Sequence, residues 1–134
     1  MIIEVPGIPL PLKRHRSFLR GGKIGQYDPQ LKEKILFQKK LRAHLCEKGV
    51  ITSLLSNDCP FVLLSFYMPF PKSQLKKNTI IEEIPHNKKP DLDNLIKFVL
   101  DCGNGLLWLD DSKITYIAAF KEYGKDPKTI IEII

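Results

Sequence analysis

The feature that most constrains the fold is the order in which two hydrophobic periodicities follow one another along the chain. Four short segments are rich in β-branched or aromatic side chains, which is typical of strands. These segments are residues 1–12, 61–68, 114–123 and 129–134. Apolar residues at three- and four-residue steps predict two helices, over residues 29–48 and from Asp91 to Asn104–Gly105. Because the strands flank the helices without regular alternation, we expect an α+β fold with a mixed β-sheet and two main helices.

Local signals refine the first half of this pattern. Three prolines within residues 1–12 favour an edge position for that strand, because proline cannot donate a hydrogen bond to a ladder. Asp28 is expected to cap the first helix, with Pro29 at its first position. Its apolar stripe is expected to comprise Leu31, Ile35, Leu41 and Leu45. The lysines of this helix, Lys34 among them, are expected on the opposite, solvated face.

Length and cysteine content limit the class of protein to which this chain can belong. A chain of 134 residues suits one domain, residues 1–134, because domains usually run about 100–200 residues. The longest uncharged apolar run is about half of the roughly 20 residues that a membrane span needs, so we expect no membrane helix and no membrane partner. At the N-terminus the charges follow the apolar stretch, which is the reverse of a secretory signal. Three cysteines without a CxxC spacing argue against disulfides or zinc and favour a reducing, cytoplasmic location.

The positive charge is concentrated in the first part of the chain. The formal net charge is +6, and the first fifty residues carry 11 basic and 4 acidic side chains. Such a balance is typical of proteins that bind a polyanion such as nucleic acid, although a solvated basic surface has the same composition. A long polar connection, residues 69–90, carries further basic residues that are candidates for DNA contact. These are Lys72, Lys76, Lys88 and Lys89.

An acidic cluster within this basic chain points to metal chemistry. Asp91 directly precedes the second helix, Asp93 lies in its first turn, and Asp110 and Asp111 follow an apolar segment after the helix. We expect that segment, residues 106–109, to bring the chain back along the helix toward its N-terminus. Gathered carboxylates repel one another unless a hard cation such as Mg²⁺, or Mn²⁺ as a substitute, binds between them. A single aspartate here would instead be interpreted as a helix cap.

Lys97 follows Asp93 by one helical turn and has two interpretations. It can form an ordinary i,i+4 ion pair with Asp93, or it can meet a phosphate oxygen beside the metal. Asp101, one further turn along, is interpreted as structural. By physical reasoning alone, a one-metal or two-metal phosphodiesterase and a non-catalytic DNA-binding module, with aspartates as caps, both remain open.

These residues resemble the RusA family of bacterial and phage Holliday junction resolvases. The family pattern is a K/R-P-D-x-D-N-L-x-K opening, a D-A-L-N-G-like helix end, and a tryptophan before a D-D pair. It stands here over residues 89–97, 101–105 and 108–111, with weaker similarity over most of the chain. One departure is Cys102-Gly103, which replaces the small apolar pair usual after Asp101.

The resemblance implies a small α+β homodimer that resolves four-way DNA junctions with magnesium, by paired symmetric nicks, in recombination and repair. It implies that Asp91, Asp93 and Asp111 hold the metal, with Asp110 beside them, and that Lys97 is the catalytic lysine. It also gives a DNA-binding role to the basic stretch of Lys13, Arg14 and Arg16. The homodimer has a physical reason as well, because a four-way junction offers two equivalent strands that a two-fold dimer meets symmetrically. A less selective nuclease acting on other branched DNA is the alternative enzyme.

Overall fold

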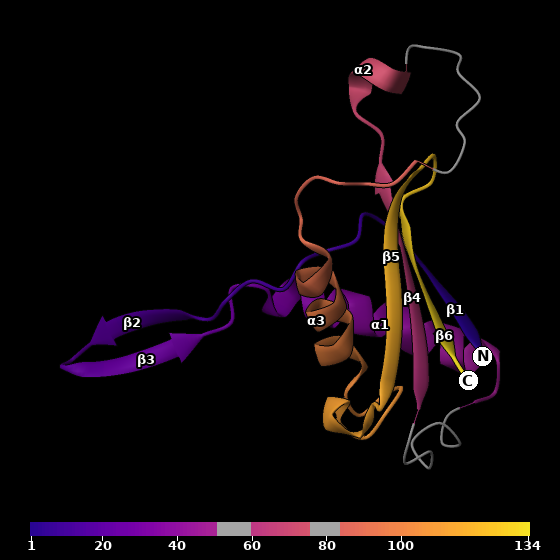
Figure 1. Cartoon of the computed structure of the whole chain (residues 1–134). Coiled ribbons are helices and arrows are strands. Elements are labelled where there is room, and N and C mark those ends of the chain that lie inside the picture. The colour runs from indigo at the N-terminus through magenta and orange to yellow at the C-terminus, as the bar shows by residue number, and fades with distance from the viewer. Residues whose placement is uncertain (51–59, 76–83) are drawn as a thin grey trace.

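The computed structural model describes residues 1–50, 60–75 and 84–134 of the chain. Its strands are β1 (Ile2–Pro6), β2 (Arg16–Arg20), β3 (Lys23–Tyr27), β4 (Phe61–Pro69), β5 (Tyr116–Gly124) and β6 (Lys128–Ile133). Its helices are α1 (Leu31–Glu47), the short α2 (Lys72–Leu75), α3 (Leu92–Gly103) and a 3₁₀ turn, η2 (Asp111–Lys113). The predicted α+β fold, with a mixed sheet and two main helices, is confirmed (Figure 1).

The main sheet has the strand order β1-β6-β4-β5. β6 is antiparallel to both of its neighbours, whereas β4 and β5 run parallel. A parallel pair needs a long crossover connection, and α3 lies within the one between β4 and β5. Among the described strands β1 pairs only with β6, so the predicted edge position of the first strand is confirmed. No helix in the described part of the chain is long and apolar enough to cross a membrane.

One face of the sheet forms the core with both main helices. Alternate residues of β4 are buried, as the period of two in a strand requires. They join side chains of α1 and α3, and the fully buried Trp108, in one cluster. The cluster includes Val62, Leu64, Phe66, Met68, Phe37, Leu41, Leu45, Leu95, Phe98 and Val99. This packing fixes α3, and therefore the residues at its two ends, against the sheet.

The predicted inward face of α1 is partly wrong. Leu31 and Ile35 are exposed, and the helix buries Phe37, Leu41 and Leu45 instead. These three recur at four-residue steps, so they define one side of the helix, and Lys34 lies on that side rather than in solvent. The predicted cap is also displaced, because Gln30 is the N-cap residue and its backbone N–H donates to the Asp28 side chain (2.8 Å).

The segment after α3 does not return along the helix as predicted. The backbone N–H groups of Leu106 and Leu107 donate to the Gly103 carbonyl at 3.0 and 2.8 Å, which makes a tight turn. The Trp108 indole then donates to the Leu100 carbonyl (3.3 Å) and to the Asn104 side chain (2.9 Å). Trp108 lies so close to Gly103 that a Cβ there would be 2.3 Å from the ring. These contacts hold the chain at the C-terminal end of α3, and β5 is the element that runs back along the helix (Figure 1).

The hairpin formed by β2 and β3 was not predicted from the sequence. Its turn is formed by Gly21 and Gly22, both with positive φ (59° and 77°), a conformation that glycine adopts readily. The two strands pair antiparallel and project away from the body of the protein (Figure 1). Because both faces of the hairpin are exposed, its strands lack the apolar alternation by which a strand is predicted.

Candidate active site

The N-terminal end of α3 carries the first two predicted site residues. Asp91 is the N-cap residue in an extended conformation, and its backbone carbonyl accepts from the Leu95 N–H at 3.2 Å. Its side chain makes no capping hydrogen bond and is exposed. Asp93, in the first turn of the helix, is exposed as well. Because the helix start does not use the Asp91 carboxylate as a cap, both carboxylates are available to a ligand.

Lys97 lies on the same face of α3 as Asp93. Its ammonium is 3.3 Å from the Asp93 carboxylate, and both side chains are more than half exposed. An exposed i,i+4 pair of this kind contributes about 0.3–0.5 kcal/mol. The ion pair therefore holds the Lys97 ammonium beside the acidic residues. Because the pair is weak, the ammonium can leave Asp93 for a phosphate at little cost in free energy.

Asp101 has a different partner from the one its spacing suggests. Its carboxylate lies 3.4 Å from the Lys34 ammonium of α1, which also contacts Asp28 at 2.6 Å. The hydrogen bond from Lys34 and that from the Gln30 backbone lower the pKa of Asp28. Burial opposes the charge of Lys34, but the Asp28 and Asp101 carboxylates outweigh it and raise the pKa of Lys34. This network joins α1 to α3.

The second acidic pair lies at the opposite end of α3. Asp110 accepts a hydrogen bond from the Ser112 N–H (2.9 Å), and contacts with Ser112 lower the pKa of the Asp110 carboxyl. Asp111 begins η2, which Figure 1 shows beyond the last turn of the helix. The 12 residues of α3 span about 18 Å.

This separation decides which residues of one chain fit a metal. Within residues 1–50, 60–75 and 84–134, no group of three or more acidic, histidine or cysteine side chains is arranged to hold an ion. Asp91 and Asp93 alone suit magnesium, which often takes one or two carboxylates and keeps several waters. The predicted four-carboxylate cluster is therefore not assembled within the described part of a single chain.

Lys121 of β5 supports the N-terminal end of α3, a role that was not predicted from the sequence. Its ammonium donates to the Pro90 carbonyl at 2.6 Å and to the Lys88 carbonyl. These two carbonyls bracket Lys89 and lead directly into Asp91. A strand far along the sequence therefore fixes the backbone that presents the Asp91 carboxylate. A lysine within an otherwise ordinary strand carries no local signal of this role.

His86 lies behind this support. Its backbone N–H donates to the Lys121 carbonyl (3.1 Å), and its ring centroid lies 4.7 Å from that of Tyr123. The side chain is buried, and Nδ1 has no hydrogen-bond partner among the described residues. Burial, and then the nearby Lys121 and Lys88 charges, lower the pKa of His86. The imidazole is therefore held neutral against the back of the loop that ends at Asp91.

A groove of about 500 Å³ connects Asp91 with the basic N-terminal stretch. It is lined by Pro11, Leu12, Lys89, Pro90, Asp91 and Asn94. The Leu12 N–H donates to the Asn94 carbonyl of α3 at 2.8 Å. The buried Gln30 amide accepts from the Lys13 N–H (2.6 Å) and donates to the Pro11 carbonyl (2.7 Å). The chain leaves the groove toward the hairpin at Lys13.

The candidate DNA-binding residues lie in three places. Lys13 and Arg14 are exposed between the groove and the hairpin, and Arg16 is exposed at the start of β2. Lys88 and Lys89 are exposed beside Asp91, and Lys72 is exposed on α2. Lys76 lies outside the described residues. The structure therefore brings five of the seven candidates to the Asp91 side of the molecule.

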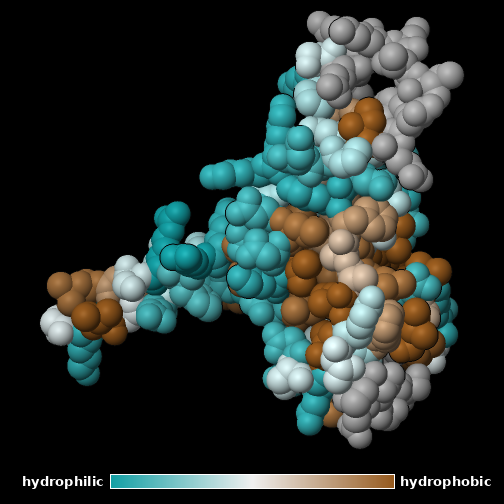
Figure 2. Space-filling model, in the orientation of Figure 1, coloured by the Kyte–Doolittle hydropathy of each residue, from teal (hydrophilic) through white to brown (hydrophobic). Residues whose placement is uncertain are grey.

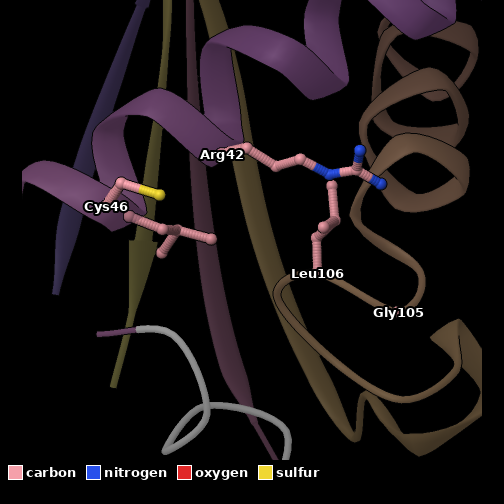
Figure 3. A pocket seen from close by; sticks show the side chains of 5 residues that line it. Arg42, Cys46, Gly105 and Leu106 are labelled. Carbon is pink, nitrogen blue, oxygen red and sulfur yellow. The ribbon is translucent and has the colours of Figure 1, made fainter. Parts of the chain in front are cut away.

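A second cavity, of about 300 Å³, lies away from these residues. It is lined by Arg42, Leu45 and Cys46 of α1 and by Gly105 and Leu106 of the turn after α3. Figure 3 shows the Arg42 side chain extending from α1 across to Leu106. None of the predicted site residues lines it.

Comparison with known proteins identifies the family. A family model described as "Endodeoxyribonuclease RusA" matches residues 6–134. The chain belongs to the RusA family. The resemblance seen in residues 89–111 is thus confirmed and extends over nearly the whole chain. A Bacillus subtilis (strain 168) protein, "Uncharacterized protein YqaN", is 31% identical over 138 residues, covering 96% of this chain and 92% of that protein.

Members of the RusA family share a general nuclease activity. The family model describes endodeoxyribonucleases, and RusA proteins act on branched DNA junctions. Nucleases of the RusA family depend in general on a metal ion. The acidic start of α3, beside a groove with a basic border, is the part of this chain that suits such an activity.

Proposed function

We propose that this protein resolves four-way DNA junctions by magnesium-dependent, paired symmetric nicks during recombination and repair. We also propose that residues 1–134 work as one endonuclease domain in the cytoplasm. The observation that carries the proposal is the exposed pair Asp91 and Asp93, with Lys97 beside it, at a groove bordered by Lys89. Manganese is expected to substitute for magnesium, since both prefer oxygen ligands.

The residues at the start of α3 divide the work of phosphodiester hydrolysis. Asp91 and Asp93 would hold the ion, and the positive end of the helix dipole offsets part of their repulsion. When bound, the ion supplies an activated water and stabilises the charge that develops on the phosphate. Lys97 donates to a phosphate oxygen after leaving its weak pair with Asp93. Lys88 and Lys89 hold the DNA backbone at the entrance to the groove.

We propose that Asp110 and Asp111 contribute to the active site of the other copy in a homodimer. They lie beyond the far end of α3, and among the described residues they form no group of three carboxylates with Asp91 and Asp93 that could hold an ion. A second copy related by a two-fold axis can bring its own Asp111 to that metal, and the reverse contact then follows from symmetry. Each of the two sites would combine residues of both copies, which suits paired nicking.

The test is subunit mixing with a synthetic four-way junction. Asp91→Asn and Asp111→Asn proteins are each assayed for cleavage with magnesium, alone and after mixing and subunit exchange. Each variant alone should be inactive. A mixed dimer contains one site with both substitutions and one intact site, so single nicks should reappear. A tag on one variant verifies that mixed dimers have formed.

The outcomes separate the parts of the proposal. A verified mixed dimer that stays inactive would place the Asp91 and Asp111 functions in the same chain and refute the shared site. Wild-type protein that binds the junction but does not nick it with magnesium would instead support the alternative, a non-catalytic DNA-binding module. Equal cleavage of flaps and forks would favour the less selective nuclease.

A further inference from the structure

The β2–β3 hairpin has two chemically different faces. Directly opposed residues of an antiparallel pair point to the same side of the ribbon. The register pairs Arg16 with Tyr27, Phe18 with Gly25 and Arg20 with Lys23, so these residues share one face. We call Arg16, Phe18, Arg20, Lys23 and Tyr27 the basic aromatic face. The other face consists of Ser17, Leu19, Ile24 and Gln26, and it carries no charge.

The aromatic rings are fixed on the ribbon. A Cβ built on Gly25 would lie 2.4 Å from the Phe18 ring, so the ring packs directly against the Gly25 backbone. The Tyr27 ring lies 6.2 Å from it, centroid to centroid. Both residues nevertheless remain nearly half exposed, at 45% and 46%. Their outer surfaces are therefore available to a planar partner without rearrangement of the hairpin.

The charge around these rings indicates a polyanionic partner. Residues 13–27 contain five lysines and arginines and no acidic residue. In Figure 2 the hairpin stands clear of the body, with apolar atoms gathered at its far end and hydrophilic atoms between them and the body. An isolated two-stranded hairpin is only marginally stable in water. Aromatic rings interleaved with arginine are the combination that binds unpaired nucleotides, by stacking on bases and pairing with phosphates.

The base of the hairpin lies beside the candidate active site. The Leu12 N–H donates to the Asn94 carbonyl at the groove that includes Asp91. Gln30 holds the chain just after the hairpin against Pro11 and Lys13, just before it. Each strand has five residues, so the hairpin extends about 17 Å from this base. DNA held at Asp91 is thus within reach of the rings.

We propose that the basic aromatic face binds the unstacked nucleotides at the centre of a DNA branch point. Phe18 and Tyr27 stack on bases that have lost their neighbours, and Arg16, Arg20 and Lys23 contact the adjoining phosphates. A fully paired duplex offers the rings no free base face, so the stacking contacts favour branched over linear DNA. This inference rests on the proposed junction substrate and names the part of the chain that selects it.

The experiment compares two DNAs and two double substitutions in the absence of divalent metal. Dissociation constants are measured by fluorescence anisotropy for a four-way junction and for a duplex of the same arm sequence. Phe18→Ala with Tyr27→Ala should weaken junction binding by about fivefold or more for each ring, the usual effect of losing one stacked base. Duplex binding should change less than about twofold, because backbone contacts remain. Leu19→Ala with Ile24→Ala is the matched control on the uncharged face and should alter neither constant.

Each result supports or overturns the inference. Restored junction preference in a Phe18→Trp, Tyr27→Phe protein, which keeps two rings, would support stacking and argue against misfolding. Equal weakening of both DNAs, no weakening, or an effect of the control equal to that of the ring substitutions would overturn it. Magnesium-dependent cleavage is scored separately with wild-type protein. Wild-type protein that fails to cut but keeps ring-dependent junction preference would refute the proposed function and leave this inference standing.

Discussion

Replacing Lys121 by methionine tests whether the Asp91 carboxylate depends on a strand that does not itself touch the substrate. The ammonium of Lys121 donates to the Pro90 and Lys88 carbonyls, the former at 2.6 Å. A hydrogen bond from a charged donor contributes about 1.5–3 kcal/mol, so the loop that ends at Asp91 loses its main side-chain support. A displacement of about 1 Å at a reacting group can reduce the rate by about 100-fold. Methionine keeps the aliphatic stem, so the packing of β5 is largely retained.

The assay is single-turnover cleavage of a four-way junction by the Lys121→Met protein at saturating protein concentration. We expect the cleavage rate to fall about 10- to 100-fold, with junction affinity in the absence of metal nearly unchanged. Lys121→Arg should recover much of the rate, because a guanidinium can donate to both carbonyls. Lys125→Met, in the turn after β5, is the matched control and should cut like wild type. A Lys121→Met protein that cuts at the wild-type rate, or whose loss equals its unfolded fraction in a thermal melt, would refute the reasoning.

Three further predictions concern other parts of the chain. Lys97→Ala should reduce the rate of single-turnover cleavage by about 10²–10³-fold. Asp101→Ala should remain active and lose only stability. Equal activity of the two variants would show that Lys97 forms only a surface ion pair. Replacing Lys13, Arg14 and Arg16 together by alanine should lower the salt dependence of junction binding, by about 0.9 in log–log slope for each lost phosphate contact; an unchanged slope in a salt titration would contradict this. Folding lowers the pKa of His86. Below about pH 6.5 the unfolded chain therefore binds more protons than the folded protein, and the free energy of unfolding decreases as the pH is lowered. Urea unfolding of wild type at pH 7 and pH 5 should show this loss, and a His86→Gln protein that loses as much would contradict it.

The sequence predicted the elements that depend on local pattern. The strand at 61–68 and the two at the C-terminal end have dense β-branched and aromatic side chains, and all three lie in the sheet. Asp91 before an apolar stripe marked the start of α3 within one residue. These features succeed because they are set by neighbours three or four residues away, which is the range of helix and strand periodicity. The family was visible for a related reason, since its motif residues lie close together along the chain.

Some predictions were wrong where tertiary packing determined which face of an element is buried. The periodicity of α1 allows more than one inward side, and contacts with the sheet and with α3 selected the side that carries Phe37 and Leu41. That choice brought Lys34 to Asp28 and Asp101, a network that no local pattern indicates. The hairpin of β2 and β3 went unpredicted because a ribbon exposed on both faces shows no apolar alternation.

The sequence by itself determined the chemistry available to this protein: acidic residues in a family pattern, a lysine one turn away and a basic N-terminal half. The tertiary structure decided where those groups meet. Trp108, packed on Gly103, holds Asp110 and Asp111 at the far end of α3, and Lys121 reaches from β5 to the backbone before Asp91. Both outcomes depend on contacts between residues that a strand or helix separates. The physical reason is that side-chain packing in three dimensions, rather than spacing along the chain, sets the distance between charged groups.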